Sequence, residues 1–288
     1  MKPLGVVYRE LILGGHLLAF GTASIAGAAA FLSGRSPTLV LLVMAYLFSF
    51  GAYMMNRSAE MDLDLKSHPE RTNYLARRRR ALPGVVGGSF LIGYVLAATV
   101  DWVFFLALLA PLLLSLLYSV GSERFVGLIG APNLKQKLLM KNLTISLGWS
   151  LIPLLVGLYF GGFNVPLLLL CPFIFFRFMT STVIFDIRDA EGDKENGVRT
   201  VPTELGVRRS FDLVGALDAA SAAYIVGLLV SGLLPAYCLT LLTLPVYSTV
   251  YRIAARKNAS NLGFICDVVC DAEFLFWGPL IYLGNILI

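Results

Sequence analysis

An acid-rich stretch at 186–202, reading DIRDAEGDKENGVRTVP, follows directly on an apolar run. Its aspartates Asp186, Asp189 and Asp193 recur at intervals of three and four residues, so on a helix they lie along one face. In an apolar chain such charges are costly unless a cation or basic side chains neutralise them. Carboxylate oxygens with no His or Cys beside them suit a hard cation such as Mg²⁺ that holds a phosphate. The stretch therefore predicts a metal site for an anionic ligand.

A second stripe of oxygen-bearing side chains lies far upstream. Asn56, Glu60 and Asp64 recur every four residues and would project along one side of a helix that leaves an apolar run. As in the first stretch, basic residues at 77–80 and then Pro83 follow the acids. Taken alone, this stripe also suits a solvated helix end at a membrane surface. Two acidic helix ends in one chain favour a shared ligand instead, and we expect them to face each other across a cavity.

The chain that has to position these residues is strongly apolar. Of its 288 residues 57% are hydrophobic and 14% are charged, and its mean hydropathy is +0.77, well above an average soluble domain. We predict an all-α, polytopic membrane protein with about nine transmembrane helices, forming one domain over residues 1–288. The apolar segments fall at 11–33, 38–56, 84–100, 102–120, 142–161, 165–186, 211–232, 235–251 and 272–288.

The distribution of Lys and Arg predicts an orientation in the membrane. With the N-terminus in the cytoplasm, nearly all of the 23 basic residues fall on the cytoplasmic side. We expect a multi-pass protein of the cell membrane whose acidic stretches face the cytoplasm. The net charge of +5 then reflects this bias and an anionic ligand, and it gives no reason to expect nucleic acid. The loops on this side are long, at 57–83, 121–141, 187–210 and 252–271.

Charges inside the apolar segments permit a different interpretation. Arg177 and Asp218 are intramembrane charges, and the alternative function is a secondary transporter that uses them as its pathway. They are also candidates for pairing with each other. The clustering of acids at helix ends favours an enzyme over the transporter. Asp267 and Asp271, four residues apart, precede no basic, Gly-rich stretch, so a solvated helix end is favoured there.

The motifs are similar to those of one family. The string Asp189-x-x-x-Asp193-x-x-x-Gly197-x-Arg199-Thr200-x-Pro202 resembles the second aspartate-rich motif of the UbiA superfamily of intramembrane prenyltransferases. The Asn56, Glu60 and Asp64 stripe resembles the first motif, usually Asn-Asp-x-x-Asp-x-x-x-Asp, with Arg at position 57 and Glu at position 60 as departures. The resemblance extends over essentially the whole chain and includes Arg80-Ala81-Leu82-Pro83-Gly84 and Tyr118-Ser119.

The resemblance implies a helical bundle around a central cavity, in which Mg²⁺ held by both acidic motifs binds the diphosphate of a polyprenyl donor such as geranylgeranyl diphosphate. Ionisation of the carbon–oxygen bond would give an allylic carbocation, which a lipophilic acceptor captures. The acceptor stays open among hydroxybenzoates, naphthoates, homogentisate, haem, chlorophyllide and geranylgeranylglyceryl phosphate. Residues 189–193 of the second motif, Asp-x-Glu-Gly-Asp, slightly favour a glycerophosphate or tetrapyrrole acceptor.

The resemblance also implies a role for each site residue, within an enzyme whose other partners are membrane lipids. Asp64, Asp189 and Asp193 are the expected catalytic residues. Metal ligation is expected of Asn56, Glu60, Asp64, Asp186, Asp189 and Asp193, with Asp186 in a supporting position. Diphosphate binding is expected of Arg80, Tyr118, Lys137, Lys141 and Arg199, because cationic and hydroxyl donors bind phosphate oxygens well.

Overall fold

A computed structural model describes residues 3–59, 61, 68–120, 139–195, 197–258 and 261–288. Every regular element in these ranges is helical, in agreement with the predicted all-α class. The elements are α1 (Pro3–Tyr8), η1 (Arg9–Leu13), α2 (His16–Leu32), α3 (Leu39–Ala59), α5 (Pro69–Ala76), α6 (Leu82–Ala98), α7 (Trp102–Ala107), α8 (Leu109–Val120), α10 (Met140–Ser150), α11 (Ile152–Phe160), α12 (Val165–Glu195), α13 (Val201–Leu205), α14 (Val207–Val230), η3 (Ala236–Leu242), α15 (Thr243–Lys257), α16 (Leu262–Phe264), η5 (Ile265–Cys270), η6 (Glu273–Phe276) and α17 (Trp277–Leu287).

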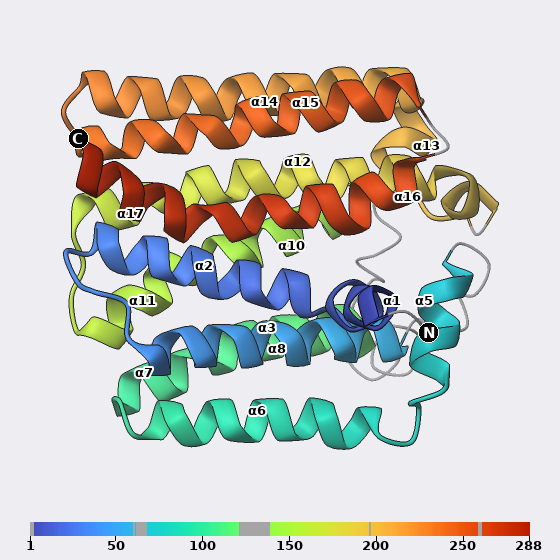
Figure 1. Ribbon diagram of the computed structural model, residues 1–288, viewed down its shortest axis with the longest axis horizontal. Helices are drawn as coiled ribbons and strands as arrows, with labels where there is room; N and C mark the ends of the chain where they lie inside the picture. Colours follow the sequence, from blue (N-terminus) through green and yellow to red (C-terminus); the bar gives the residue numbers. More distant parts are fainter. Residues whose placement is uncertain (1–2, 60, 62–67, 121–138, 196, 259–260) are drawn as a thin grey trace.

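The long helices lie nearly side by side, with α14 and α15 along one edge of the bundle and α6 along the other (Figure 1). Aromatic packing joins the helices between these edges. Phe178 of α12 stacks on Trp149 of α10 with ring centroids 4.4 Å apart, and on Phe274 of η6 at 4.3 Å. Buried aromatic side chains contribute large apolar contact areas. This core therefore fixes α12 against the elements on both sides of it.

Each of the nine predicted apolar segments contains helix. Judged by length and composition, five helices in the described ranges are suited to cross a membrane. A sixth is added if Gly5–Leu13 and His16–Leu32, which meet at an angle of 61°, count as one span. The bend requires Gly15, which has a φ of 74° and lies so close to the Tyr53 ring that a Cβ would approach it to 2.5 Å.

The acid-rich stretch is helical for longer than the sequence suggested. The sequence predicts a loop from residue 187, but α12 continues to Glu195, so the three aspartates lie on helix. Two residues beyond the end of α12 lies Gly197, whose φ of 67° is left-handed. The Val198 N–H donates to the carbonyl of Asp193 at 2.8 Å, the pattern of a Schellman motif. Gly197 therefore ends the helix just after the last acidic turn.

The next motif residues begin another helix. The Thr200 backbone N–H donates to the Thr203 hydroxyl at 2.8 Å, and the two residues form a capping box at the start of α13. Pro202 occupies the first turn of α13, where a missing N–H costs nothing. The spacing from Asp193 to Pro202 is thus explained by a helix end followed at once by a helix start.

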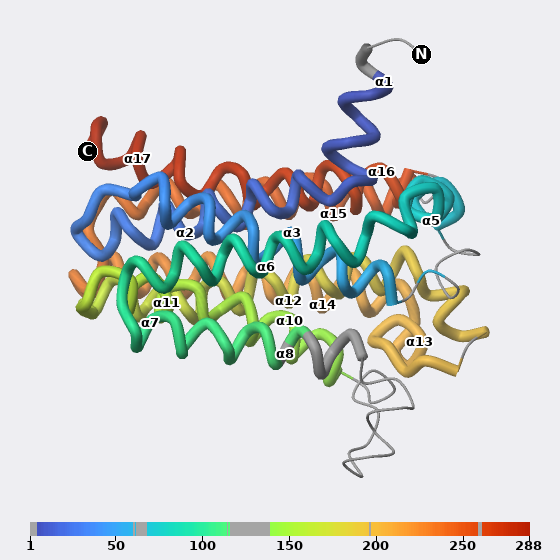
Figure 2. Tube along the Cα trace, turned by 90° about the horizontal axis from the view of Figure 1, so that it is seen from below, coloured from blue at the N-terminus to red at the C-terminus, as the bar shows by residue number. Residues whose placement is uncertain are grey.

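The described residues of the two motifs, Asn56 on α3 and the three aspartates on α12, lie at one end of the bundle. The last turns of α3 and α12 point toward the end at which α5, α13 and α16 gather, and two perpendicular views agree on this (Figures 1 and 2). Asn56 belongs to the last turn of α3. Glu60 and Asp64 lie outside the described residues. That the two motifs face each other across a cavity therefore stays a prediction.

Candidate metal and diphosphate site

Asp186 is completely buried, and both of its carboxylate oxygens accept hydrogen bonds from α10. Lys141 Nζ donates to Oδ1 at 2.9 Å, and Asn142 Nδ2 donates to Oδ2 at 2.7 Å. A buried carboxylate with two such donors is satisfied. Asp186 therefore ties α12 to α10 and orients Lys141, whose side chain is 25% exposed. The structure thus places Lys141, a predicted diphosphate ligand, within the acidic cluster.

Asp189 lies one turn further along α12 and has two partners. Arg188 donates from Nε to Oδ1 at 2.8 Å and from Nη2 to Oδ2 at 2.9 Å. His68, immediately before α5, places Nε2 3.0 Å from the same Oδ1. Burial lowers the pKa of His68 below its ordinary value, and its hydrogen bond to Asp189 offsets part of this effect. Burial therefore favours the neutral imidazole, which can donate from Nε2 to the carboxylate.

Asp193 has a buried oxygen that can still accept a ligand. Its Oδ2 accepts no hydrogen bond from the described residues, and a buried carboxylate oxygen left in this way is costly. A hard cation satisfies such an oxygen, so the acid fits Mg²⁺. Within the described ranges no three His, Cys, Asp or Glu residues gather closely enough to hold a metal by themselves. The first motif, with Glu60 and Asp64 outside those ranges, is the predicted source of the other ligands.

Position 57 is one of the two departures from the first motif, and the one that the structure describes. The Arg57 guanidinium lies over the ring of Tyr53, one turn earlier in α3, with its carbon 5.0 Å from the ring centroid. A guanidinium above an aromatic face is stabilised by cation–π attraction. The arginine is therefore directed back along α3. Asn56, its neighbour, remains a predicted metal ligand.

The other predicted diphosphate ligands occupy different surroundings. Arg199 is 59% exposed and donates from Nε to Glu204 Oε1 at 2.7 Å, so it is turned to the surface. Arg80 is exposed in the turn between α5 and α6. Tyr118 belongs to α8, but its side chain lies outside the described part, as does the whole of Lys137. Among the three whose side chains the structure describes, Lys141 is the one with a hydrogen bond to a described acid of the motifs.

Three side chains that touch the acids were missed from the sequence. They are Arg188, His68 and Asn142. Arg188 was visible as a basic residue within the acid-rich stretch, yet adjacent residues on a helix point to different faces, so no contact with Asp189 was expected. His68 and Asn142 come from segments distant in sequence. No spacing pattern in the chain indicates either of them.

The expectation of a solvated helix end at Asp267 is wrong. Arg188 Nη1 donates to Asp267 Oδ1 at 2.7 Å, and Arg71 Nη1 lies 3.8 Å from the same oxygen. The Arg188 side chain is only 9% exposed and that of Asp267 is 29% exposed. Asp267 in η5 is thus connected through Arg188 to Asp189 of the acidic motif.

The charges behind the transporter alternative pair with each other. Arg177 donates from Nη1 to Asp218 at 2.7 Å and from Nε to Glu273 at 2.8 Å. Tyr251 donates to the same Glu273 at 3.1 Å. Arg177 has 0% side-chain exposure and Asp218 has 4%. Arg252 Nε, 3.6 Å from the second oxygen of Asp218, brings another cation to the two acids. A buried network of paired charges ties helices together and gives no support to an ion pathway.

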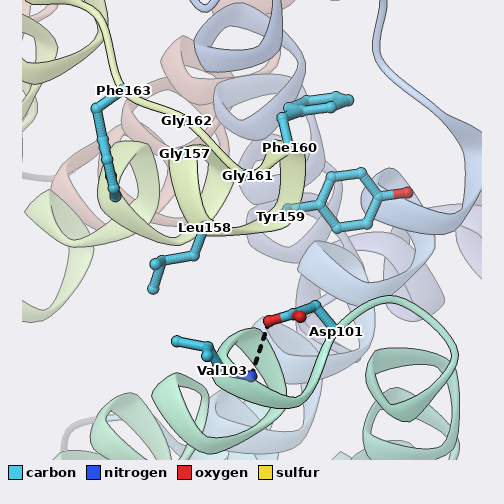
Figure 3. A pocket seen from close by; sticks show the side chains of 9 residues that line it. All are labelled: Asp101, Val103, Gly157, Leu158, Tyr159, Phe160, Gly161, Gly162 and Phe163. Carbon is cyan, nitrogen blue, oxygen red and sulfur yellow. Dashed lines mark hydrogen bonds between the residues drawn. The ribbon is translucent and has the colours of Figure 1, made fainter.

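The depression drawn in Figure 3 is separate from the acidic site. It has a volume of about 490 Å³ and is lined by Asp101, Val103 and the segment 157–163. The one carboxylate in its lining, that of Asp101, caps the start of α7, because Asp101 Oδ1 accepts a hydrogen bond from the Val103 N–H at 2.7 Å. This segment precedes the start of α12, roughly 40 Å along the helix from Asp189. The acidic site therefore lies at the opposite end of α12.

Comparisons with known proteins agree with this arrangement. The profile of the UbiA prenyltransferase family matches residues 17–266. The chain is 27% identical over 255 residues to the digeranylgeranylglyceryl phosphate synthase of Methanothermobacter thermautotrophicus, covering 85% of this chain and 86% of that protein. It is also 27% identical to the synthase of that name from Sulfurisphaera tokodaii, over 180 residues that span 60% of this chain and 59% of the relative.

Solved structures share the fold. A UbiA homologue from Aeropyrum pernix K1 superposes with a TM-score of 0.68 at 16% identity, covering 93% of this chain and 97% of that one. A UbiA homologue from Archaeoglobus fulgidus, bound to GPP and Mg²⁺, gives a TM-score of 0.64 at 18% identity, covering 95% and 96%. Together with the helical end that presents Asp189 and Asp193, the match over 17–266 makes this chain a member of the UbiA prenyltransferase family, an enzyme family of prenyl transfer.

Proposed function

We propose that this chain transfers a polyprenyl group, such as geranylgeranyl, from its diphosphate to a hydroxyl of a lipophilic glycerol phosphate, with Mg²⁺ as the metal. The observation that carries the proposal is the cluster at the end of α12, where Lys141 pairs with Asp186, Arg188 pairs with Asp189, and Asp193 keeps an open oxygen one turn further on. Oxygen ligands next to cations are what a metal-bound diphosphate requires.

The acceptor class is supported by the relatives in Methanothermobacter thermautotrophicus and Sulfurisphaera tokodaii, which are named for the synthesis of digeranylgeranylglyceryl phosphate. The donor and metal are supported by the Archaeoglobus fulgidus homologue bound to GPP and Mg²⁺. We propose the same chemistry here, carried out by a single membrane domain of nine spans in the cell membrane. Its acidic end would face the cytoplasm, as the distribution of basic residues favours.

The predicted ligands of the metal are Asp189 and Asp193 on α12 together with the first-motif residues Asn56, Glu60 and Asp64. Bound Mg²⁺ would neutralise diphosphate oxygens and assist departure of that group. Asp186 would act behind these ligands, because both of its oxygens already hold α10 side chains. Lys141, positioned by Asp186, would stabilise the negative charge that develops on the leaving diphosphate. Further diphosphate contacts are predicted for Arg80, Tyr118, Lys137 and Arg199.

The transfer itself exchanges one carbon–oxygen bond for another. The bond between the first prenyl carbon and the diphosphate breaks with both electrons remaining on the diphosphate oxygen, which leaves an allylic carbocation. A lone pair of the acceptor hydroxyl then forms the ether bond to that carbon. The hydroxyl proton passes to the released diphosphate. Apolar surroundings exclude water, which would otherwise capture the cation.

The test is prenyl transfer by purified protein in detergent. The protein is incubated with Mg²⁺, labelled geranylgeranyl diphosphate and either geranylgeranylglyceryl phosphate, geranylgeranylglycerol or hydroxybenzoate. Product is expected with the glycerol phosphate acceptor only. Product with hydroxybenzoate alone would contradict the proposed acceptor, and failure to bind any prenyl diphosphate would contradict the enzyme.

A pair of variants tests the site. Asp189→Ala is expected to abolish Mg²⁺-dependent binding of the donor, because it removes a predicted ligand from α12. Asp212→Ala is the control, since it removes an aspartate of α14 that pairs with Arg256 at 2.9 Å and is 58% exposed. Donor binding by Asp189→Ala at the wild-type level would place the metal elsewhere. Binding is followed by equilibrium dialysis of the labelled donor with and without Mg²⁺.

A further inference from the structure

Asp267 stands outside both acidic motifs but is connected to one of them. Its Oδ1 accepts from Arg188 Nη1 at 2.7 Å, while Arg188 uses Nε and Nη2 for the two oxygens of Asp189. One guanidinium therefore serves two carboxylates, one on η5 and one on α12. The Arg188 side chain is 9% exposed, so protein groups surround this shared cation more than water does.

We propose that Asp267 is a positioning residue that keeps Asp189 available to a divalent cation by sharing Arg188 with it. The inference deepens the proposed function and rests on it for the identity of Asp189 as a metal ligand. Asp267 itself touches neither metal nor substrate in this assignment. It acts through Arg188.

The physical reason is competition for the Asp189 carboxylate. A bidentate guanidinium and a metal ion both bind the lone pairs of the same two oxygens. While Asp267 neutralises Arg188 from the other side, Arg188 can withdraw from Asp189 and remain paired in a poorly solvated place. Without Asp267, withdrawal would leave a buried cation with less compensation, which is costly. Asp189 would then stay bound to Arg188, and metal affinity would fall.

The position of Asp267 supports a role in orientation. It lies in η5, which also supplies Cys266 and Cys270 to the buried core against α12. The anchoring carboxylate is therefore held by packing as well as by Arg188. Arg71 of α5, at 3.8 Å from Asp267, brings a second cation to the same oxygen. Groups that orient metal ligands from behind commonly change metal affinity by about 10- to 100-fold when they are removed.

The experiment measures Mn²⁺ binding to the full-length protein in detergent by electron paramagnetic resonance, without donor or acceptor. Asp267→Ala is expected to weaken Mn²⁺ binding by about tenfold, and Asp267→Glu is expected to restore most of it. Asp267→Asn keeps the side-chain shape without its charge and should weaken binding too, which provides a second variant if Asp267→Ala fails to fold. Asp212→Ala is the control, because it removes an exposed aspartate of α14 that pairs with Arg256, and its affinity for Mn²⁺ should be unchanged.

A double-mutant cycle separates positioning from general damage. If Asp267 acts through Arg188, then Asp267→Ala has no further effect on Mn²⁺ affinity once Arg188→Gln is present. Equal weakening in both backgrounds would overturn the inference, as would wild-type affinity in Asp267→Ala. If the wild type binds Mn²⁺ but does not transfer a prenyl group, the proposed function is contradicted and the role of Asp267 in metal binding is not. If the wild type binds no Mn²⁺, both the proposed function and the role of Asp267 are contradicted.

Discussion

Three aspartates on one face of α12 have different surroundings. Asp186 is buried with both oxygens occupied by Lys141 and Asn142. Asp189 is shared between Arg188 and His68. Asp193 retains a buried oxygen that takes no hydrogen bond within the described residues. The same side chain thus has three different environments: Asp193 alone keeps an open oxygen, and Asp189 is predicted to bind a metal ion when Arg188 withdraws from it.

His68 provides a test at this scale, because it is one of only two histidines in the chain. Its burial opposes the charged imidazolium, so we expect its pKa to lie below the ordinary value of about 6.5. The pKa is lowered because burial has a larger effect on it than the hydrogen bond to Asp189, which raises it. Nuclear magnetic resonance of labelled histidine across pH 5–8 measures it.

The variant His16→Gln assigns the remaining resonance to His68. Asp189→Asn should lower the pKa of His68 further, because the carboxylate is the group that raises it. A midpoint above the ordinary histidine value would show that the Asp189 charge outweighs burial, contrary to this expectation.

Among the elements, α12 carries two sets of charges with different uses. Its last turns hold the acids, whereas Arg177 lies earlier in the helix and joins Asp218 of α14 to Glu273 of η6. The network fixes α12 between two neighbours, and the Schellman motif at Gly197 ends the helix at a defined residue. Rigid support at both places determines where the acidic face points.

A comparison of two arginines tests the network. Arg177→Met is expected to lower the free energy of unfolding by about 3–5 kcal/mol, because it leaves Glu273 buried without its cation and Asp218 with Arg252 at 3.6 Å. Arg256→Met removes an exposed partner of Asp212 and should cost at most about 1 kcal/mol. Thermal and denaturant unfolding in the same detergent measure both.

Equal stability of the two arginine variants would contradict a structural role for the network. Donor binding by the folded fraction of Arg177→Met is expected to persist, since Arg177 lies about 18 Å along α12 from Asp189.

For the whole molecule, the exposed surface carries many large apolar side chains. Leu91 and Val95 of α6 are 65% and 58% exposed, and Val246 and Val250 of α15 are both 63% exposed. These helices form the two edges of the bundle in Figure 1. Apolar outer faces are expected where lipid is the solvent. The functional end and the end drawn in Figure 3 then belong to opposite sides of the membrane.

Site-specific labelling tests this topology. Arg208→Cys and Ser231→Cys are exposed positions at the two ends of α14, a 24-residue helix about 36 Å long. A membrane-impermeant maleimide should reach Arg208→Cys from the cytoplasmic side only and Ser231→Cys from the other side only. The parent protein, whose four cysteines are free, gives the background. Labelling of both positions from one side would contradict the spanning of α14.

The helical class, the apolar segments and the acidic face that includes Asp189 and Asp193 could all be predicted from the order of the residues. Hydropathy and periodicity are local properties, so they can be read along the chain. Three contacts could not be predicted in this way: Asp186 with Lys141, Arg188 with both Asp189 and Asp267, and His68 with Asp189. These contacts depend on where distant helices pack, and neither the spacing nor the charge of neighbouring residues encodes that placement.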